Sequence, residues 1–377
     1  MAALLSNIDP DGLLEYSVVF TDRSLNSMSK AFQEVMNDIS TMLKSVYKAN
    51  GVAIIPGGGT FAMEAVARQF ATNQNAMIVR NGWFSYRWTQ IFEACDMPKT
   101  STVMKAHRSL DNTQAPFAPV PIDELVAKIS TEKPDVVFAP HVETSAGMML
   151  PDDYIKQAAA AVHEHGGLFV LDCIASGTIW VDMAATGVDV LVSAPQKGWS
   201  ASPAAGLVMM SDRALAKLSE TSSSSFACDL KKWYDIMMAY ENGGHAYHAT
   251  MPTDALRRFR DIMIETKEFG FDKVCANQME LGTRIRAALE AEGFKSVAAK
   301  GFQAPGVVVS YTDDPDIKSG KKFAANGMQI AAGVPLMCDE GEDYQSFRIG
   351  LFGLDKLKDV DGAVERFETV LKKVVAA

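Results

Sequence analysis

Apolar positions near the start of the chain follow the spacing of a helix that buries one face. Between residues 26 and 50, apolar side chains recur every three or four positions. These residues are Met28, Phe32, Val35, Met36, Ile39, Leu43, Val46 and Tyr47. Gly51 follows, and glycine is a common stop signal, so we predict a helix over residues 26–50.

Six short apolar runs then alternate with stretches of helical spacing. They cover residues 52–55, 76–79, 136–139, 168–171, 188–192 and 206–210. Runs this short, in which apolar and polar residues do not alternate, are typical of strands in a parallel sheet that helices cover on both faces. We therefore predict an α/β fold with a mostly parallel sheet between helices.

The pattern changes after Pro252 to one long helical stretch. This stretch covers residues 254–292, and Gly293 ends it. Two strand candidates follow at residues 306–311 and 346–350. A last amphipathic helix carries Val360, Val364, Phe367, Leu371 and Val374 on its apolar face.

A chain of 377 residues is long enough for two domains. The change of pattern favours a large domain of residues 20–255 and a smaller C-terminal α/β domain of residues 256–377. We expect the N-terminal residues 1–19 to pack against the small domain or against a partner subunit.

Composition and charge narrow the classes of partner. Lys and Arg total 36 against 46 Asp and Glu, so the formal net charge of −10 disfavours nucleic acid and anionic membranes. The five cysteines form no CxxC pair and have no metal-type spacing with the histidines. The chain has no apolar run of membrane-spanning length and no signal-peptide pattern at its start. We predict a reduced, cytoplasmic protein without a metal site.

Candidate chemistry lies just after the predicted strands, because ligands of open α/β sheets bind at the carboxyl ends of strands. Gly57, Gly58, Gly59 and Thr60 join one strand to a helix. Glycines let the backbone approach a ligand, and the free N–H groups of the helix start favour a phosphate. The segment matches neither nucleotide-binding glycine motif, and a plain glycine turn is the alternative.

An acidic and a basic residue follow two further strands. Asp172 comes directly after the apolar run 168–171. A carboxylate buried there needs a partner, and a protonated pyridine nitrogen would be a fitting one. Capping of a neighbouring loop is the alternative. Lys197 follows the next run among apolar and small residues, which disfavour its ammonium form. A neutral lysine amine attacks aldehydes, although a lone lysine is more often solvated. The spacing of the two residues favours the chemical interpretation.

Arg348 lies in the last strand candidate, within Phe347-Arg348-Ile349-Gly350. Its guanidinium group matches a substrate carboxylate through two parallel hydrogen bonds. A surface salt bridge is the alternative.

Together these residues resemble the class V aminotransferases of fold type I, and within them the alanine/serine–glyoxylate aminotransferase branch. The likeness extends from about Asn26 to Leu371. It implies pyridoxal 5'-phosphate (PLP) as cofactor, held as a Schiff base on Lys197, with Asp172 at the pyridine nitrogen. The segment 171–177 resembles the family's VDxVASxGG motif, which implies that Ile174 packs under the cofactor ring.

Other motifs of the family imply further cofactor contacts. Gly58, Gly59 and Thr60 match its phosphate-binding turn, and the NGxF-like segment 81–84 implies that Phe84 stacks on the ring. The HxESSTG-like segment 141–147 implies that Thr144 lies near the cofactor and the substrate.

Three more positions follow from the resemblance. Gln196, directly before the lysine, corresponds to a cofactor-binding glutamine. The YHxTxP-like segment 247–252 implies that Tyr247 and Thr250 reach the phosphate in the neighbouring subunit of a homodimer. Arg348 falls on the family's substrate-carboxylate arginine.

Two departures concern the pocket. Residues 20–26 stand where the family has a PGP loop, so the resemblance does not name the amino donor. Ala194 and Pro195 replace a more common Gly-Ser, which removes one hydroxyl contact to the phosphate unless Ser193 supplies it.

The resemblance implies a ping-pong aminotransferase that moves an amino group from a small amino acid, such as alanine or serine, to glyoxylate or pyruvate. Another class V enzyme, a cysteine desulfurase or a β-eliminating lyase, is the first alternative; Cys338 is the one loop cysteine that we would test for it. A non-enzymatic scaffold or nucleotide binder is the second, and it leaves Lys197 and Arg348 unexplained.

Overall fold

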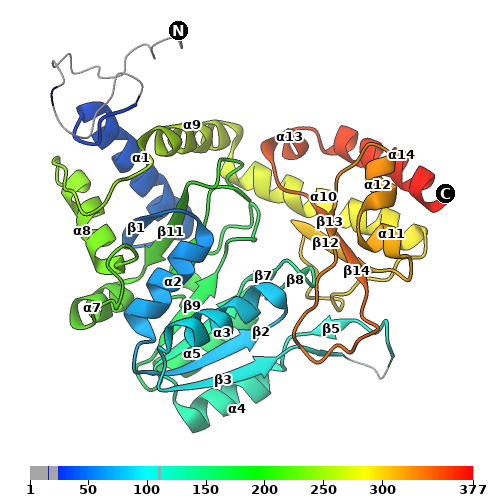
Figure 1. Ribbon diagram of the computed structural model, residues 1–377, viewed down its shortest axis with the longest axis horizontal. Coiled ribbons are helices and arrows are strands. Elements are labelled where there is room, and N and C mark those ends of the chain that lie inside the picture. The colour runs from blue at the N-terminus through cyan, green and yellow to red at the C-terminus, as the bar shows by residue number, and fades with distance from the viewer. Residues whose placement is uncertain (1–15, 17–23, 109–111, 377) are drawn as a thin grey trace.

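A seven-stranded sheet forms the centre of the protein in the computed structural model, which describes residues 16, 24–108 and 112–376 (Figure 1). The strand order is β1-β11-β10-β9-β6-β2-β3. The strands are β1 (Gly51–Pro56), β2 (Asn75–Arg80), β3 (Thr100–Lys105), β6 (Val136–Pro140), β9 (Leu168–Asp172), β10 (Val190–Ser193) and β11 (Ala205–Met210). The six predicted strands are all present. The edge strand β3 was not predicted, because only Val103 and Met104 in it are apolar.

The strand directions bring the candidate chemistry to one edge of this sheet. β11 runs antiparallel to both of its neighbours, β1 and β10, and the other neighbouring pairs are parallel. The carboxyl ends of β1, β2, β6, β9 and β10 therefore meet at the same edge. Successive residues of β6, β9 and β10 are all buried, as expected for strands covered on both faces.

Helices connect and cover these strands. They are α1 (Lys30–Tyr47), α2 (Gly59–Phe70), α3 (Trp83–Cys95), α4 (Ile122–Glu132), α5 (Asp152–His163), α6 (Met183–Thr186), α7 (Asp212–Glu220), α8 (Leu230–Glu241) and α9 (Thr253–Phe269). The helix predicted over residues 26–50 is shorter. The Ser29 side chain caps its start, and Lys48, with a left-handed φ of 56°, ends it. Gly51 begins β1 and is not the helix stop.

A smaller sheet lies beside the large one, in the yellow to red part of Figure 1. Its strand order is β12-β14-β13, and all its pairs are antiparallel. Its elements and the surrounding helices are α10 (Phe271–Ala291), β12 (Val307–Tyr311), α11 (Pro315–Lys318), α12 (Lys321–Ala325), β13 (Ala331–Ala332), β14 (Ser346–Gly350), α13 (Leu354–Leu357) and α14 (Val360–Ala376). Two short hairpin-like pairs complete the strands: β4 (His107–Arg108) with β5 (Phe117–Ala118), and β7 (Val142–Glu143) with β8 (Met148–Met149).

The single long helix predicted over residues 254–292 is wrong. Gly270, with a φ of 107°, separates α9 from α10. Glycine adopts this conformation without the steric cost that other residues meet. The prediction missed the break because apolar residues recur at helical spacing both before and after Gly270, and a single glycine was the one local signal between them.

The packing changes across this break. Leu256, Phe259 and Met263 of α9 belong to the core around the large sheet, whereas Val274 and Leu281 of α10 pack with the small sheet. The domain boundary between residues 255 and 256 stays a prediction. The expectation for residues 1–19 falls outside the described residues, apart from the exposed Tyr16.

Candidate active site

The loops after β1, β6, β9 and β10 enclose a cavity of about 360 Å³ at the carboxyl edge of the large sheet. Most of the predicted site residues line it: Gly58, Gly59, Thr60, Phe84, Thr144, Asp172, Ile174, Gln196 and Lys197. They come from segments far apart in the sequence, and the sheet topology brings them together. Tyr247, Thr250 and Arg348 do not line this cavity.

Asp172 is the last residue of β9 and is only 7% exposed. Its Oδ1 accepts a hydrogen bond of 2.9 Å from the backbone N–H of Ile174. Burial raises the pKa of the carboxyl to about 7, and the negative charge of Glu143 acts in the same direction, whereas the Ile174 N–H and the charge of Arg87 lower it. In the part of the chain that the structure describes, no cation forms an ion pair with it. A cationic group in the cavity would stabilise its ionised form.

Lys197 follows β10, which is parallel to β9, with Val192 in register with Asp172. Its side chain is half-buried, and its Nζ lies 5.0 Å from the centre of the Phe352 ring. Burial lowers the pKa of the ammonium, and the positive charge of Arg348 lowers it further. Both effects favour the neutral amine, which is the form that attacks a carbonyl.

The glycine turn after β1 leaves backbone N–H groups free at the start of α2. Gly57 has a φ of 121°, a conformation that favours glycine, and a Cβ on Gly59 would lie 2.5 Å from Cδ1 of Ile174. Gly58, the N-cap, has no side chain that could accept a hydrogen bond from the first N–H groups of the helix. The turn therefore offers unpaired N–H donors and a helix N-terminus to an anionic group.

A polar atom next to the lysine also lacks a partner. The buried Oε1 of Gln196 accepts no hydrogen bond from any described residue. Buried polar groups normally have a partner, so this atom and the Asp172 carboxylate together fit a polar ligand. The glycine turn, Lys197 and Asp172 together suit a ligand that has a phosphate, an aldehyde and a basic ring nitrogen. PLP has these three groups.

Phe84 lies in the first turn of α3, which a buried carboxylate holds in place. Glu143, fully buried, accepts hydrogen bonds from the backbone N–H groups of Phe84 at 3.1 Å and Ser85 at 2.8 Å. It also accepts bonds from the hydroxyls of Ser85 and Ser145, both at 2.7 Å. Sequence reasoning did not assign Glu143, although an acidic residue among hydroxyl residues after a strand was a signal for a helix cap.

Arg348 in β14 reaches the site from the small sheet. Its Nε donates to the carbonyl oxygen of Ala332 at 2.8 Å, and its Cζ lies 5.6 Å from the centre of the Phe84 ring. Burial lowers the pKa of the guanidinium, and the charges of Glu143 and Tyr344 raise it. Arg348 forms no ion pair with a described residue. The alternative interpretation of this arginine, a surface salt bridge, therefore has no counterpart among the described residues.

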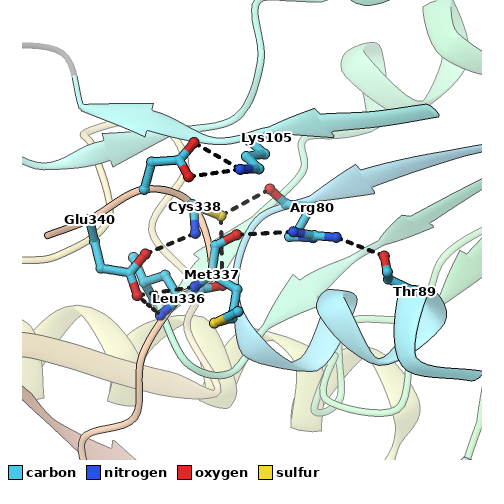
Figure 2. A network of polar contacts seen from close by, with 8 residues as sticks. Arg80, Thr89, Lys105, Leu336, Met337, Cys338 and Glu340 are labelled. Carbon is cyan, nitrogen blue, oxygen red and sulfur yellow. Dashed lines mark hydrogen bonds and ion pairs between the residues drawn. The ribbon is translucent and has the colours of Figure 1, made fainter. Parts of the chain in front are cut away.

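The loop before β14 is tied to the large sheet by the network in Figure 2. We call residues 336–340 the clamp loop. The Glu340 carboxylate accepts hydrogen bonds from the backbone N–H groups of Leu336, Met337 and Cys338 at 2.6, 3.1 and 2.8 Å. This carboxylate therefore fixes the shape of the loop from within.

Two residues at the end of the large sheet hold the clamp loop from outside (Figure 2). Arg80, the last residue of β2, donates from Nη1 to the Met337 carbonyl at 3.2 Å, and Lys105 pairs with Asp339 at 2.8 Å. Because Arg80 directly precedes the Asn81-Gly82 segment that leads into α3, the network joins the strand carrying Arg348 to the helix carrying Phe84.

Cys338 is buried inside this network and only 4% exposed. Its thiol donates to the Arg80 carbonyl oxygen at 3.3 Å. Burial raises its pKa to about 12, with Glu143 and Glu340 adding to the effect. A reactive cysteine is accessible and ionises readily, whereas Cys338 is buried and its pKa is raised.

Tyr247 and Thr250 lie together on the surface, away from the cavity of their own chain. The Tyr247 side chain is 67% exposed, and its hydroxyl is 3.3 Å from that of Thr250. The structure does not bring this pair to the other candidate residues within one chain.

Neither a metal-binding cluster nor a membrane-spanning helix is found among the described residues. No group of His, Cys, Asp and Glu side chains among them is arranged to hold a metal ion. None of the helices formed by these residues is long and apolar enough to cross a membrane.

Comparison with known proteins places the chain among transaminases. The family model described as "Aminotransferase class-V" matches residues 13–325. The chain is 27% identical over 344 residues to 2-aminoethylphosphonate–pyruvate transaminase 2 of Paraburkholderia xenovorans, covering 88% of this chain and 86% of the relative. It is 26% identical over 337 residues to the serine–glyoxylate aminotransferase of Hyphomicrobium methylovorum, covering 88% and 80%.

A solved structure has the same fold. The alanine–glyoxylate aminotransferase from Nostoc sp. superposes with a TM-score of 0.75 at 21% identity, covering 98% of this chain and 90% of that one. The predicted α/β arrangement, a mostly parallel large sheet with a smaller C-terminal sheet, is thereby confirmed.

Proposed function

The chain belongs to the class-V aminotransferase family, and from this we propose that it moves an amino group from a small amino acid, such as alanine or serine, to a 2-oxo acid, such as glyoxylate or pyruvate. It is a PLP-dependent transaminase with the architecture of fold type I. The relatives named for glyoxylate and pyruvate support these acceptors. The single observation that carries the proposal is the pair Asp172 and Lys197, facing one cavity from adjacent parallel strands.

The residues of the cavity fit the three polar parts of PLP. We assign Asp172 to the ring nitrogen, the turn Gly58-Gly59-Thr60 to the phosphate, and Phe84 and Ile174 to the two faces of the ring. Thr144 and Gln196 complete the lining around the ring substituents. When bound, the cofactor supplies an aldehyde that links to amines and a ring that accepts electrons.

Lys197 has two roles in the proposal. Its amine would attach the cofactor, and the lowered pKa favours the neutral, nucleophilic form that this needs. When it is not linked to the cofactor, the same group would take the proton from the substrate's α-carbon as a general base. Asp172, ionised beside a cation, would hold a proton on the ring nitrogen of the bound cofactor.

Arg348 is assigned to the substrate carboxylate. Its guanidinium lies beside Phe84, and Nε already donates to Ala332, which leaves the two terminal nitrogens for a two-pronged contact. The clamp loop holds the strand that carries this arginine.

We also propose a homodimer with shared sites. Tyr247 and Thr250 are exposed and outside the cavity of their own chain, which suits residues that serve a partner's phosphate. Mixing an inactive Tyr247 and Thr250 double variant with an inactive Lys197→Ala variant tests this. Hybrid dimers regain activity at one site if the residues act across the interface, and no recovery contradicts the assignment.

The proposed location is the cytoplasm. All five cysteines are free, and three of them are buried in the fold. This usage fits a reducing compartment.

A panel of half-reactions tests the function. The yellow holoenzyme is mixed with single amino acids, and the loss of the absorption band of the lysine-bound cofactor is followed together with the oxo acid formed. We expect rapid conversion by alanine or serine and recovery of the band on addition of glyoxylate or pyruvate. Sulfide release from cysteine without oxo-acid formation would contradict the proposal.

A further inference from the structure

Arg87 is a cavity residue to which neither the sequence motifs nor the comparisons give a role. It lies in α3, one helical turn after Phe84, and its Cζ is 5.5 Å from the centre of that ring. Its Nη1 donates a hydrogen bond of 3.1 Å to Oγ1 of Thr60, in the first turn of α2. The guanidinium therefore lies beside the turn that we assign to the cofactor phosphate.

The charges around the cavity leave this arginine without a carboxylate partner. Within the described chain, Arg87 forms no ion pair at 4 Å or less. Arg87 and Lys197 are the cations that line the cavity, and Asp172 is the acid. Since the lysine amine is assigned to the cofactor aldehyde and the aspartate to the ring nitrogen, Arg87 is the charged side chain of the lining left to meet an anion at the glycine turn.

The phosphate site needs such a cation. A phosphate monoester carries about −1.5 to −2 charges at pH 7, whereas a helix N-terminus supplies only about +0.5. The turn contributes no side-chain donor before Thr60, because residues 57–59 are glycines, and Ala194 and Pro195 offer no hydroxyl. Backbone donors alone leave most of the phosphate charge unbalanced.

The contact with Thr60 also orients a second donor. Because the Thr60 oxygen accepts from Arg87, its own hydroxyl proton is free to point elsewhere. The guanidinium has five N–H donors, and this contact uses one of them. Arg87 and Thr60 can thus donate together to one anion.

We propose that Arg87 is a ligand of the cofactor phosphate, acting with Thr60 and the start of α2. The inference rests on the proposed function, since it takes PLP as the ligand of this cavity. A second acidic group on the substrate is the competing ligand for Arg87. The contact with Thr60 at the phosphate turn favours the phosphate, and the experiment separates the two.

The test compares cofactors with and without the phosphate. Apoenzymes of the native protein, Arg87→Gln and Arg87→Lys are titrated with PLP and with pyridoxal, and binding is followed by absorbance and tryptophan fluorescence. We expect Arg87→Gln to weaken PLP binding about 10- to 100-fold and to leave pyridoxal binding unchanged, as for a lost charged hydrogen bond. Arg87→Lys keeps the charge without the planar fork and should recover part of the loss.

Inorganic phosphate provides a readout without cofactor or turnover. Phosphate should raise the Tm of the native apoenzyme and of the control Arg366→Gln, an exposed arginine of α14, but not that of Arg87→Gln. Equal weakening of PLP and pyridoxal, or unchanged PLP binding with a raised KM for a diacid substrate, would overturn the proposal. If the native protein binds PLP and phosphate as expected yet transaminates no amino acid, the proposed function fails and the role of Arg87 stands.

Discussion

The Arg348 guanidinium carbon lies 5.6 Å from the centre of the Phe84 ring, so a residue of the small sheet meets a residue at the start of α3. Each of them is held by its own polar anchor. Glu143 accepts the backbone N–H of Phe84, and the Ala332 carbonyl accepts Nε of Arg348. The relative placement of the groups that we assign to ring stacking and to the substrate carboxylate thus depends on how the small sheet packs against the start of α3.

Replacement of Arg348 should act on substrate binding. Arg348→Gln removes the charge and the fork, so the KM for both the amino and the oxo acid should rise about 10- to 100-fold, with PLP binding retained. The KM of Arg348→Lys should lie between those of the native enzyme and of Arg348→Gln, because lysine supplies only a point charge. Steady-state kinetics with a PLP titration check this, and an unchanged KM in Arg348→Gln would remove the arginine from the substrate site.

Glu340 should affect the same binding step from a distance. Glu340→Gln weakens the acceptor of three N–H groups in the clamp loop, at a cost of about 1–3 kcal/mol in local stability. We expect a higher KM for carboxylate substrates with little change in the Kd for PLP. Hydrogen exchange of residues 336–340 should accelerate as well.

The exposed neighbour Glu342 is the matched control for this change. Glu342→Gln removes the same charge two residues after the clamp loop without touching the three N–H groups, so its KM and exchange rates should equal those of the native enzyme. Similar effects of both variants would show that the clamp loop does not position Arg348.

The stability of the apoenzyme should depend on pH through Asp172, and the sign follows from the direction of its pKa shift. Burial raises its pKa from 3.8 to about 7 in the folded chain, so between these values the folded state binds the proton more tightly than the unfolded state. The contribution of Asp172 to the free energy of unfolding is therefore fully present at the acid end of this window. It is lost as pH rises through the window, by at most about 4 kcal/mol.

Asp172→Asn removes this titration. The free energy of unfolding of the variant, relative to the native apoenzyme, should increase from pH 4 to pH 8, which urea unfolding at several pH values measures. Bound PLP should abolish the difference by supplying a cation. A difference that stays constant with pH would mean that Asp172 is not a buried, unpaired carboxylate.

The sequence allowed most of the large sheet and the cavity lining to be predicted, because short buried runs and the residues after them depend on local patterns. Asp172 and Lys197 could be found in this way, since Asp172 ends one strand and Lys197 lies in the loop that follows the next. Their closeness follows from the parallel register of β9 and β10.

Other features depend on contacts between distant segments and carry weak local signals. Glu143 caps α3 from the β7–β8 pair, which lies far along the chain from that helix. In the sequence nothing distinguishes Arg87 from other arginines, and its role is suggested by the contact with Thr60. The clamp loop is an irregular segment whose shape depends on Arg80 and Lys105 of the large sheet. The break at Gly270 was missed because helical apolar spacing is present on both of its sides.

The central claim is that the Lys197 amine carries the cofactor, and borohydride trapping tests it most directly. The native holoenzyme is reduced with borohydride, digested and mapped by mass spectrometry, with Lys197→Ala treated in parallel. We predict a pyridoxyl-phosphate label on the peptide containing Lys197, and, in the variant, cofactor that dialyses away together with a loss of turnover of at least about a thousandfold. A label on another lysine, or undiminished turnover of Lys197→Ala, would contradict the account.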